Sequence, residues 1–452
     1  MKGTRKSVFG AALCAVALMG LGCACAEEPS WAAQVNGEAL PLYETQVTHQ
    51  RTWSQTPLLT SLSPVGVMEW QEGETLQVQL TFPETVESAL IRPLSLGLEP
   101  QVEGNRVSFP VEGPGSYTVE INGSYMGAAH LFAVPRTEAP EGAIVLEAGE
   151  HEQDIVLTSG QTLYLSAGCV LKGKIYAENA KDIAVLGPGM IDGSGFDRWK
   201  QTTVPIDFES CSNFRIENIT ILDPAAWTVN LYHCTEGNIR NVHIVGSRSN
   251  SDGFTLQSCE DVTVSGCFVR SWDDSLVVKG YDGDSRRIRF ENCVIWTDLA
   301  QSCEIGYETR ADVMEDITFE NITVLHNFHK PVLSIHNSDR AQIRNVTFRN
   351  IVVEDAQMGE GDGANLLIEL TTTRSQWSKD KERGSIRNVL IENVNVLSGK
   401  ENAIRIFSFK DHANIDDVTI RNLTILGRPI ESLEDVKFNG NKYNGGNIRL
   451  EP

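Results

Sequence analysis

The chain has little positive charge for its size. Its 452 residues include 38 Lys and Arg against 60 Asp and Glu, which gives a formal net charge of −22 at pH 7. A surface of this sign repels phosphate backbones, so nucleic acid is not expected as a partner. The acidic excess also gives no general attraction to a polyanionic substrate, although it leaves room for a local basic groove.

Long apolar runs are missing after the first 26 residues, so no membrane span is expected beyond them. Residues 1–26 themselves predict a signal peptide. Three basic residues precede the apolar stretch VFGAALCAVALMGLG, and ACA at 24–26 is a small-residue cleavage site. A lipid anchor on Cys23 and an uncleaved membrane anchor are the alternatives. We therefore expect a secreted or cell-surface protein.

The chain contains no C-x-x-C pair, and the number of cysteines beyond residue 26 is odd. This pattern argues against a zinc site and against a full disulfide framework, although one disulfide is compatible with export. We expect these cysteines to act as small buried apolar side chains, and we expect no metal or organic cofactor. The seven are Cys169, Cys211, Cys234, Cys259, Cys267, Cys293 and Cys303.

Helix-period patterns are scarce, and short alternating segments are common. Between residues 27 and 135, the segments LQVQLTF, SALIRPL, RVSFPV and SYTVEING are separated by turn residues. This texture predicts a small antiparallel β-sandwich. The segment VPRTEAPEGA (134–143) has two prolines and mixed charge, which is typical of a linker.

From about residue 143 to 452 the sequence repeats the pattern apolar-x-apolar-x-Asn-apolar-x-apolar, as in FRIENITIL and ITFENITVL. The gaps between copies run from 23 to 29 residues, with one of 43. A leucine-rich repeat would need Leu-dominated slots and helical turns, whereas these slots favour Ile, Val and Phe. The expected fold is therefore all-β, with a right-handed parallel β-helix after the sandwich. The recurring polar positions are Asn218, Asn241, Gly266, Asn292, Asn321, Asn350, Asn393 and Asn422.

Two features follow from a stack of coils. A side chain that recurs at one coil position can bond to its copies above and below, so we expect the Asn positions to form a ladder at a bend. The gap of 43 residues implies a long excursion at Glu354–Ser385, and we expect this excursion to wall a cleft.

The candidate chemistry lies in the segment SWDDSLVVKG. Asp273 and Asp274 precede an apolar strand, and Asp252 stands 21 residues earlier, close to one coil. Adjacent coils lie about 4.8 Å apart, so the three carboxyl groups are expected to share one patch. Crowded like charges raise proton affinity, and a proton donor can then stand beside a carboxylate base. The alternative is three unrelated solvated aspartates on bends.

The two carboxylate motifs resemble those of the polygalacturonase family of glycoside hydrolases, family 28. Asn250-Ser251-Asp252 matches its Asn-Thr-Asp motif, and Trp272-Asp273-Asp274 matches its Gly-Asp-Asp motif. The resemblance covers about 143 to 450. Gln301 stands where the His of the family's Gly-His-Gly motif belongs, and no Arg-x-Lys follows. In the family those basic residues hold a galacturonate carboxylate, so the departures put pectin in doubt.

The segment EIGYETR, together with a sandwich ahead of the β-helix, resembles the dextranase/isopullulanase family, family 49, which degrades neutral glucans. Both resemblances imply a hydrolase that inverts the anomeric configuration. They imply Asp273 as the general acid, with Asp252 and Asp274 positioning and activating water.

Further residues near these motifs are candidate substrate ligands. Trp272, Tyr307 and Trp296 present rings on which a sugar could stack, although packing is the alternative for each. Lys279 could bind a hydroxyl or a carboxylate, or merely end a strand. The full set of predicted substrate-binding residues is Asn250, Trp272, Lys279, Gln301, Glu304 and Tyr307, with His336 as a further subsite candidate.

Three functions are compatible with these observations. The first is an exported polysaccharide hydrolase, polygalacturonase-like or dextranase-like, which we expect to be a monomer. The second is a β-helix polysaccharide lyase, which typically needs calcium or a basic cluster beside the acids, and the sequence shows no such cluster. The third is a non-catalytic carbohydrate-binding protein, in which the carboxylate spacing would be accidental.

Overall fold

A computed structural model describes residues 30–49, 59–197, 204–358, 365–410, 414–441, 444–445 and 447–452. The predicted signal peptide, 1–26, lies outside these residues. The only helical segment in the described ranges is the 3₁₀ turn η1, Leu94–Leu96. Among the same residues, no helix has the length and apolar character that crossing a bilayer requires.

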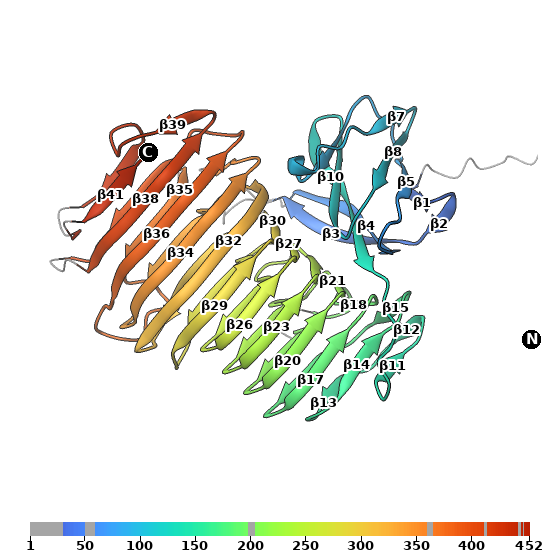
Figure 1. Cartoon of the computed structure of the whole chain (residues 1–452), viewed down its shortest axis with the longest axis horizontal. Helices are drawn as coiled ribbons and strands as arrows, with labels where there is room; N and C mark the ends of the chain where they lie inside the picture. The colour runs from blue at the N-terminus through green and yellow to red at the C-terminus, as the bar shows by residue number, and fades with distance from the viewer. Residues whose placement is uncertain are drawn as a thin grey trace, which may run out of the picture.

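The N-terminal region forms two sheets of five strands each (Figure 1). In order, the first contains β2 (Glu38–Leu40), β1 (Ala32–Val35), β5 (Leu76–Thr81), β8 (Arg106–Val111) and β7 (Gln101–Glu103). The second contains β3 (Leu42–His49), β4 (Leu59–Trp70), β10 (Ser124–Pro135), β9 (Gly115–Ile121) and β6 (Ala89–Arg92). Strands of both sheets contribute to one hydrophobic core, for example Leu80 and Phe109 from the first and Val119 and Leu131 from the second.

The rest of the chain stacks into coils, as Figure 1 shows from β13 to β41. One side of the coils is a sheet of 11 strands. It contains β13 (Ile155–Leu157), β16 (Ile175–Glu178), β19 (Ile206–Glu209), β22 (Val229–Tyr232), β25 (Phe254–Gln257), β28 (Leu276–Gly280), β31 (Cys303–Thr309), β33 (Leu333–Asn337), β35 (Leu366–Thr372), β37 (Ala403–Phe407) and β40 (Lys437–Gly440).

The remaining sides of the coils form one sheet of 20 strands. In order these are β11 (Ile144–Leu146), β12 (Gly149–His151), β14 (Thr162–Leu165), β15 (Cys169–Leu171), β17 (Lys181–Leu186), β18 (Met190–Asp192), β20 (Ser212–Glu217), β21 (Thr220–Leu222), β23 (Thr235–Arg240), β24 (His243–Val245), β26 (Glu260–Ser265), β27 (Phe268–Ser271), β29 (Ser285–Glu291), β30 (Val294–Thr297), β32 (Val313–Asn327), β34 (Gln342–Val353), β36 (Ser385–Val396), β38 (Ile415–Ile425), β39 (Arg428–Ile430) and β41 (Ile448–Glu451).

Neighbouring coils pair in parallel, and this confirms the predicted parallel β-helix; its right-handed sense stays a prediction. Identical positions of successive coils stack inside it. Phe290, Phe319 and Phe348 are in register on β29, β32 and β34, and their rings stack with centroids 5.0 and 4.9 Å apart. Each fully buried ring contributes roughly 1.5–3 kcal/mol. The seven cysteines beyond residue 26 lie in the same interior as free thiols, and all of them are buried, as predicted.

The asparagine ladder is confirmed. Asn350 has φ of 56°, in the left-handed region, and its side-chain amide donates to Asn321 Oδ1 at 2.9 Å. Asn393 donates in turn to Asn350 at 2.8 Å. Gly266, in the same slot, supplies the backbone conformation with φ of 62° but has no amide to donate. The ladder therefore fixes the bend and the spacing of the coils together.

The excursion predicted at Glu354–Ser385 is more ordered than a loop. Its segment Leu366–Thr372 is β35, which pairs in parallel with β33 and β37. The excursion is thus a full coil with extra residues on either side of its strand. The sequence pattern missed this strand because the repeated asparagine lies on the 20-stranded sheet, whereas LLIELTT belongs to the 11-stranded sheet.

The N-terminal sheets pack on the β-helix through an apolar cluster and a buried ionic cluster. Phe132 and Val65 meet Phe268 and Trp296 in the apolar part. Trp296 is 0% exposed there, with the Arg270 guanidinium 4.0 Å from the centroid of its ring. The expectation that Trp296 stacks on a sugar is therefore wrong, because its ring faces the N-terminal sheets.

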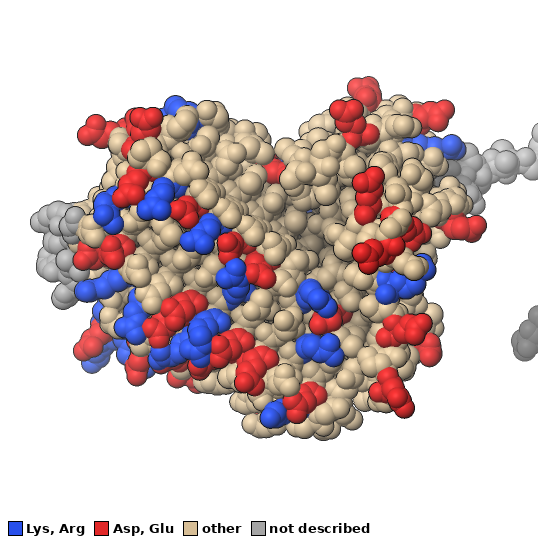
Figure 2. All heavy atoms as spheres, in the orientation of Figure 1, with Lys and Arg blue, Asp and Glu red and all other residues tan. Residues whose placement is uncertain are grey.

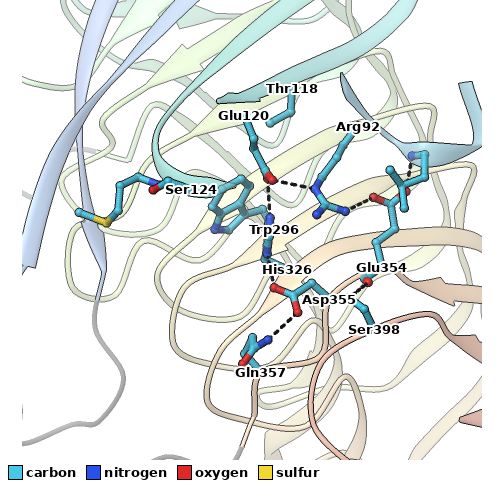
Figure 3. Close-up of polar contacts among 12 residues, drawn as sticks. Arg92, Thr118, Glu120, Ser124, Trp296, His326, Glu354, Asp355, Gln357 and Ser398 are labelled. Atoms are coloured by element: carbon cyan, nitrogen blue, oxygen red, sulfur yellow. Dashed lines mark hydrogen bonds and ion pairs between the residues drawn. The ribbon is translucent and has the colours of Figure 1, made fainter. Parts of the chain in front are cut away.

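Figure 3 shows the ionic part of this contact, which we call the interface cluster: Arg92, Glu120, His326, Glu354 and Asp355. Arg92 lies 3.0 Å from Glu120 and 2.7 Å from Glu354. His326 contacts Glu120 through Nε2 at 2.5 Å and Asp355 through Nδ1 at 2.8 Å. Glu120 and Arg92 belong to the N-terminal sheets, so the cluster fixes their position on the coils.

Candidate active site

Strand register brings the three aspartates together. β25 and β28 pair with Phe254 opposite Leu276, so Asp252 precedes β25 at the level where Asp274 precedes β28. The Gly253 N–H donates to the Asp274 carbonyl at 2.8 Å, and the Asp273 N–H donates to the Ser251 carbonyl at 3.4 Å. The spacing of 21 residues therefore does place Asp252 one coil from the acid pair.

Each carboxyl has its own setting. Asp252 and Asp274 are buried, with 2% and 7% of their surface exposed, whereas Asp273 is half-buried. The side-chain amide of Asn250 donates to Asp273 Oδ2 at 3.0 Å. The backbone N–H of Gln301 donates to Asp274 Oδ1 at 3.2 Å. Asn250 and Gln301, both predicted as substrate ligands, thus lie in the site, where they hold the carboxyl groups.

A chain of hydroxyl groups supports this turn from inside the coil. Ser271 Oγ contacts Ser275 Oγ, Ser275 contacts Thr297 Oγ1, and Thr297 contacts Ser302 Oγ, each at 2.8 Å. Asn327 donates to Ser302 at 2.8 Å. Ser271 also donates to the Asp273 carbonyl at 2.8 Å. These contacts hold the backbone that carries the acid pair, as a precise catalytic geometry requires.

Lys279 is the cation beside the aspartates. Its Nζ lies 3.6 Å from Asp252 Oδ2 and 3.5 Å from Glu308 Oε2. Burial works against its charged form, but Glu308 and Asp252 outweigh that effect and raise the pKa of Lys279. Trp227 completes this corner, with its ring centroid 5.8 Å from Nζ. Sequence reasoning missed both Glu308 and Trp227.

The proton affinities of the buried carboxyls are raised. Burial raises the pKa of Asp252 well above its ordinary value, Asp273 adds to the rise, and Lys279 opposes it. Burial also raises the pKa of Asp274, and the charges of Asp273 and Asp252 add to it. Interacting carboxyls titrate as one unit, so the group retains a proton at a pH where isolated carboxyls are ionised.

A second polar cluster begins one coil further along. Glu304 is 0% exposed, and its Oε1 lies 2.8 Å from His336 Nδ1; Ser334 also donates to this carboxylate. His336 Nε2 lies 3.2 Å from Glu369, which lies 2.8 Å from Arg405 Nη1. Burial alone would lower the pKa of His336, but Glu304 and Glu369 raise it to about 10. We call Glu304, His336, Glu369 and Arg405 the charge ladder.

The aromatic candidates differ in their access to solvent. Trp272 is buried, with 4% of its surface exposed. Its stacking on a substrate stays a prediction, and it would require neighbouring residues to move away from the ring. Tyr307 is half-buried and stacks on the His336 ring, with centroids 4.3 Å apart. Glu304 is sealed beneath the surface, whereas His336, although only 2% exposed, contributes to the lining of a hollow. No group of His, Cys, Asp and Glu in the described ranges is arranged to hold a metal.

Comparison with known proteins places this site in a family. The family model described as glycosyl hydrolases family 28 matches residues 130–439, which is more than half of the chain. The chain belongs to this family. The match spans the aspartates, Lys279 and the charge ladder, and it starts inside the N-terminal sheets at β10.

Curated relatives of this family 28 protein are distant. The probable exopolygalacturonase B of Neosartorya fischeri is 24% identical over 256 residues, which cover 50% of this chain and 54% of that protein. A probable polygalacturonase of Vitis vinifera is 30% identical over 121 residues, 24% of this chain and 25% of the relative. The alignment with the first relative thus spans about half of its length.

Solved structures support the β-helix fold of the family 28 chain. Dex49A from Penicillium minioluteum superposes with a TM-score of 0.66 over 93% of both chains, at 14% identity. An exopolygalacturonase from Thermotoga maritima superposes with a TM-score of 0.50 over 66% of this chain and 84% of its own, at 18% identity. At such low identity the likeness is one of fold.

Proposed function

We propose that the protein is an exported glycoside hydrolase that cleaves O-glycosidic bonds of a polysaccharide with inversion. The observation that carries this proposal is the register of β25 with β28, which brings Asp252, Asp273 and Asp274 to one patch. Burial raises the pKa of Asp252 and Asp274. A raised proton affinity suits a carboxylate that accepts a proton from the attacking water.

In the proposed reaction, Asp273 donates its proton to the glycosidic oxygen while the bond from that oxygen to the anomeric carbon breaks. A water molecule held by Asp252 and Asp274 attacks the anomeric carbon from the opposite face and gives a proton to one of them. Asp273 suits the donor role because it is the most exposed of the three and can reach a bound sugar. The burial of Asp252 and Asp274 suits groups that hold a small water molecule.

The stereochemical outcome needs its own test. Paired strands lie about 4.8 Å apart, whereas inverting enzymes usually hold their carboxyls roughly 6.5–9.5 Å apart. Inversion therefore requires the three side chains to splay from their strand ends. Proton NMR of the first product formed would show the opposite anomer if inversion holds, and the same anomer if one aspartate acts as a nucleophile.

Two substrate classes are candidates. The family match favours a galacturonate polymer, as its exopolygalacturonase relatives suggest. The charges at the site favour a neutral glucan, as in a dextranase-like reaction. Lys279 lies between Asp252 and Glu308. His336 lies between Glu304 and Glu369. A uronate would have to compete with these carboxylates for either cation.

The remaining parts of the proposal concern organisation. Residues 27–135 are proposed to form a β-sandwich domain, and residues 143–452 a catalytic domain of right-handed coils. The polypeptide is proposed to act as a secreted monomer after removal of residues 1–26. Mass spectrometry of the exported protein would locate the mature N-terminus, and a mass increase from lipid at Cys23 would instead indicate an anchor.

Asp273→Asn tests the assignment of the acid. The substitution keeps the shape and removes the proton donor, so we expect kcat to fall by about 10²–10⁴ with little change in melting temperature. Activity is measured as reducing ends released from polygalacturonan, dextran, pullulan and rhamnogalacturonan. Asp261→Asn is the matched control, since Asp261 is an exposed carboxylate on β26, paired with Arg287.

The same assay separates the other functions. Undiminished hydrolysis by Asp273→Asn would show that another group donates the proton. Unsaturated, ultraviolet-absorbing products from the wild type would identify a lyase. Binding of a polysaccharide with no product of either kind would identify a non-catalytic protein.

A further inference from the structure

A hollow of about 410 Å³ opens on the 11-stranded sheet, on the C-terminal side of the aspartates. Its lining includes Tyr307 of β31, His336 of β33, Thr371 and Glu369 of β35, and Phe407 of β37. Four consecutive coils therefore build it. Figure 2 shows the face of the larger sheet, on which basic and acidic side chains alternate. The hollow lies on the smaller sheet and is lined by aromatic rings, hydroxyl groups and a few charged groups.

The register shapes the hollow as a trough between two rings. His336, Thr371 and Phe407 are directly in register on β33, β35 and β37. Phe407 is the last residue of β37 and is 46% exposed, so its ring is open to a ligand. Tyr307 lies on the His336 ring at the other side. Because Thr371 is small, a gap remains between these rings, and sugar rings commonly stack on aromatic side chains in such gaps.

Each cation that lines the hollow is already paired with a carboxylate, and one of these carboxylates, Glu304, lies beneath the lining. In the charge ladder, acid and base alternate from coil to coil: Glu304, His336, Glu369, Arg405. The His336 pKa of about 10 and the Glu369 pKa of about 2 keep both groups charged at neutral pH. An anionic ligand at Arg405 would lie beside the Glu369 carboxylate and be repelled by it. Sugar hydroxyls, by contrast, can accept from the guanidinium and donate to the carboxylate without separating that pair.

The hollow is connected to the aspartates. Tyr307 at its edge is hydrogen-bonded by the side chain of Gln301, and the Gln301 backbone N–H donates to Asp274. The strand that follows the acid pair is β28, and β37 lies four strand steps from it along the sheet. This distance is roughly 19 Å. A polysaccharide bound at the aspartates can therefore extend along the sheet into the hollow.

We propose that this hollow is a sugar-binding subsite that takes an uncharged unit of the polysaccharide, several units away from the bond that is cut. The inference rests on the proposed hydrolase function and adds the class of sugar and the residues that select it. Phe407 and the Tyr307–His336 pair hold the faces of the sugar ring. Arg405, Glu369 and Thr371 bond to its hydroxyls.

Phe407→Ala tests the subsite in two assays. The first assay measures kcat/KM on oligosaccharides of increasing length. For those long enough to reach β37, we expect kcat/KM to fall about tenfold, because one stacked ring is lost. For the shortest oligosaccharides, kcat/KM should stay unchanged. Phe407→Tyr should restore the rate. Trp377→Ala is the matched control, because Trp377 is 50% exposed and lies outside the hollow.

Direct binding separates the subsite from the hydrolase proposal. The Asp273→Asn protein is titrated with oligosaccharides of dextran, pullulan and galactan, and with oligogalacturonates. We expect a neutral oligosaccharide to bind, and its affinity to fall about tenfold when Phe407→Ala is added. Binding of oligogalacturonates alone, or equal affinity with and without Phe407, would overturn the proposal. Failure of the wild type to hydrolyse any polymer would refute the hydrolase function while leaving this binding result in force.

Discussion

At the scale of single residues, Lys279 sets the proton affinity of the aspartates. It lies 3.6 Å from Asp252 and opposes the rise of that carboxyl's pKa. Lys279→Met removes the positive charge, so the pKa of Asp252 should rise further. The acid limb of the pH profile of kcat/KM, which reports the ionised base, should then move to higher pH by about one unit. Lys279→Arg keeps the charge, and its profile should stay within a few tenths of a unit of the wild type.

The measurement is the hydrolysis rate of the best polymer between pH 3 and 9. A profile for Lys279→Met that moves to lower pH, or does not move, would show that the lysine acts on bound sugar rather than on the carboxyls. A loss of affinity with an unchanged profile would point to the same conclusion.

The sequence predicted the aspartates because their spacing equals one coil, and a coil has a nearly fixed length. It missed Glu308, the second partner of Lys279. The reason is local: the pairing of β28 with β31 shifts register between Val278 and Gly280, so counting residues along a regular coil does not bring Glu308 to Lys279. Glu369 and Arg405 were missed because they come from separate coils with no shared motif.

At the scale of elements, the asparagine ladder positions one coil on the next. Asn350→Ala removes two hydrogen bonds and places an ordinary side chain at φ of 56°. We expect a loss of about 3 kcal/mol from the free energy of unfolding, since the two hydrogen bonds and the backbone conformation each contribute on the order of 1 kcal/mol. Asn350→Gly loses the same bonds but tolerates the backbone, so about two thirds of the loss is expected. Thermal unfolding of the three proteins measures the order, and equal losses would show that the left-handed backbone contributes nothing.

The repeat also explains how far the fold could be predicted. Seven asparagines and one glycine in one slot revealed the coils, because only those residue types commonly adopt the left-handed bend. β35 belongs to the 11-stranded sheet, outside the repeated asparagine pattern of the larger sheet, and read as part of a loop. The buried position of Trp296 was equally hidden, since it depends on packing against β10, more than 150 residues earlier in the chain.

At the scale of the whole molecule, the interface cluster makes stability depend on pH. Burial alone would lower the pKa of His326, but Asp355 and Glu120 raise it. A raised folded pKa gives stability that is fully present below about pH 6.5 and is lost as the pH rises through the folded value. Hydrogen bonds from His326 lower the pKa of Glu120 and of Asp355 against the effect of burial, so their contribution is lost in acid.

His326→Ala should therefore lower the free energy of unfolding at pH 6 by about 2–3 kcal/mol, because Glu120 and Asp355 lose their shared histidine but keep Arg92 and Gln357. The difference from the wild type should shrink as the pH rises through the raised pKa of His326. Melting temperatures of both proteins across this range test the prediction. A constant difference at all pH values would mean that His326 contributes by packing alone.

The contact between Arg92 and Glu354 also has a consequence for the order of assembly. These residues are 262 positions apart in the chain, whereas successive coils contact each other within 23 to 43 positions. Loop-closure entropy makes such distant contacts form late. The coils can grow from neighbour to neighbour, but the N-terminal sheets must wait for β34 before Arg92 meets its partner. Formation of the Arg92–Glu354 contact is thus expected to be a closing event of folding, and chain ends before β34 would leave the N-terminal sheets held by the apolar contacts and His326 but without this ion pair.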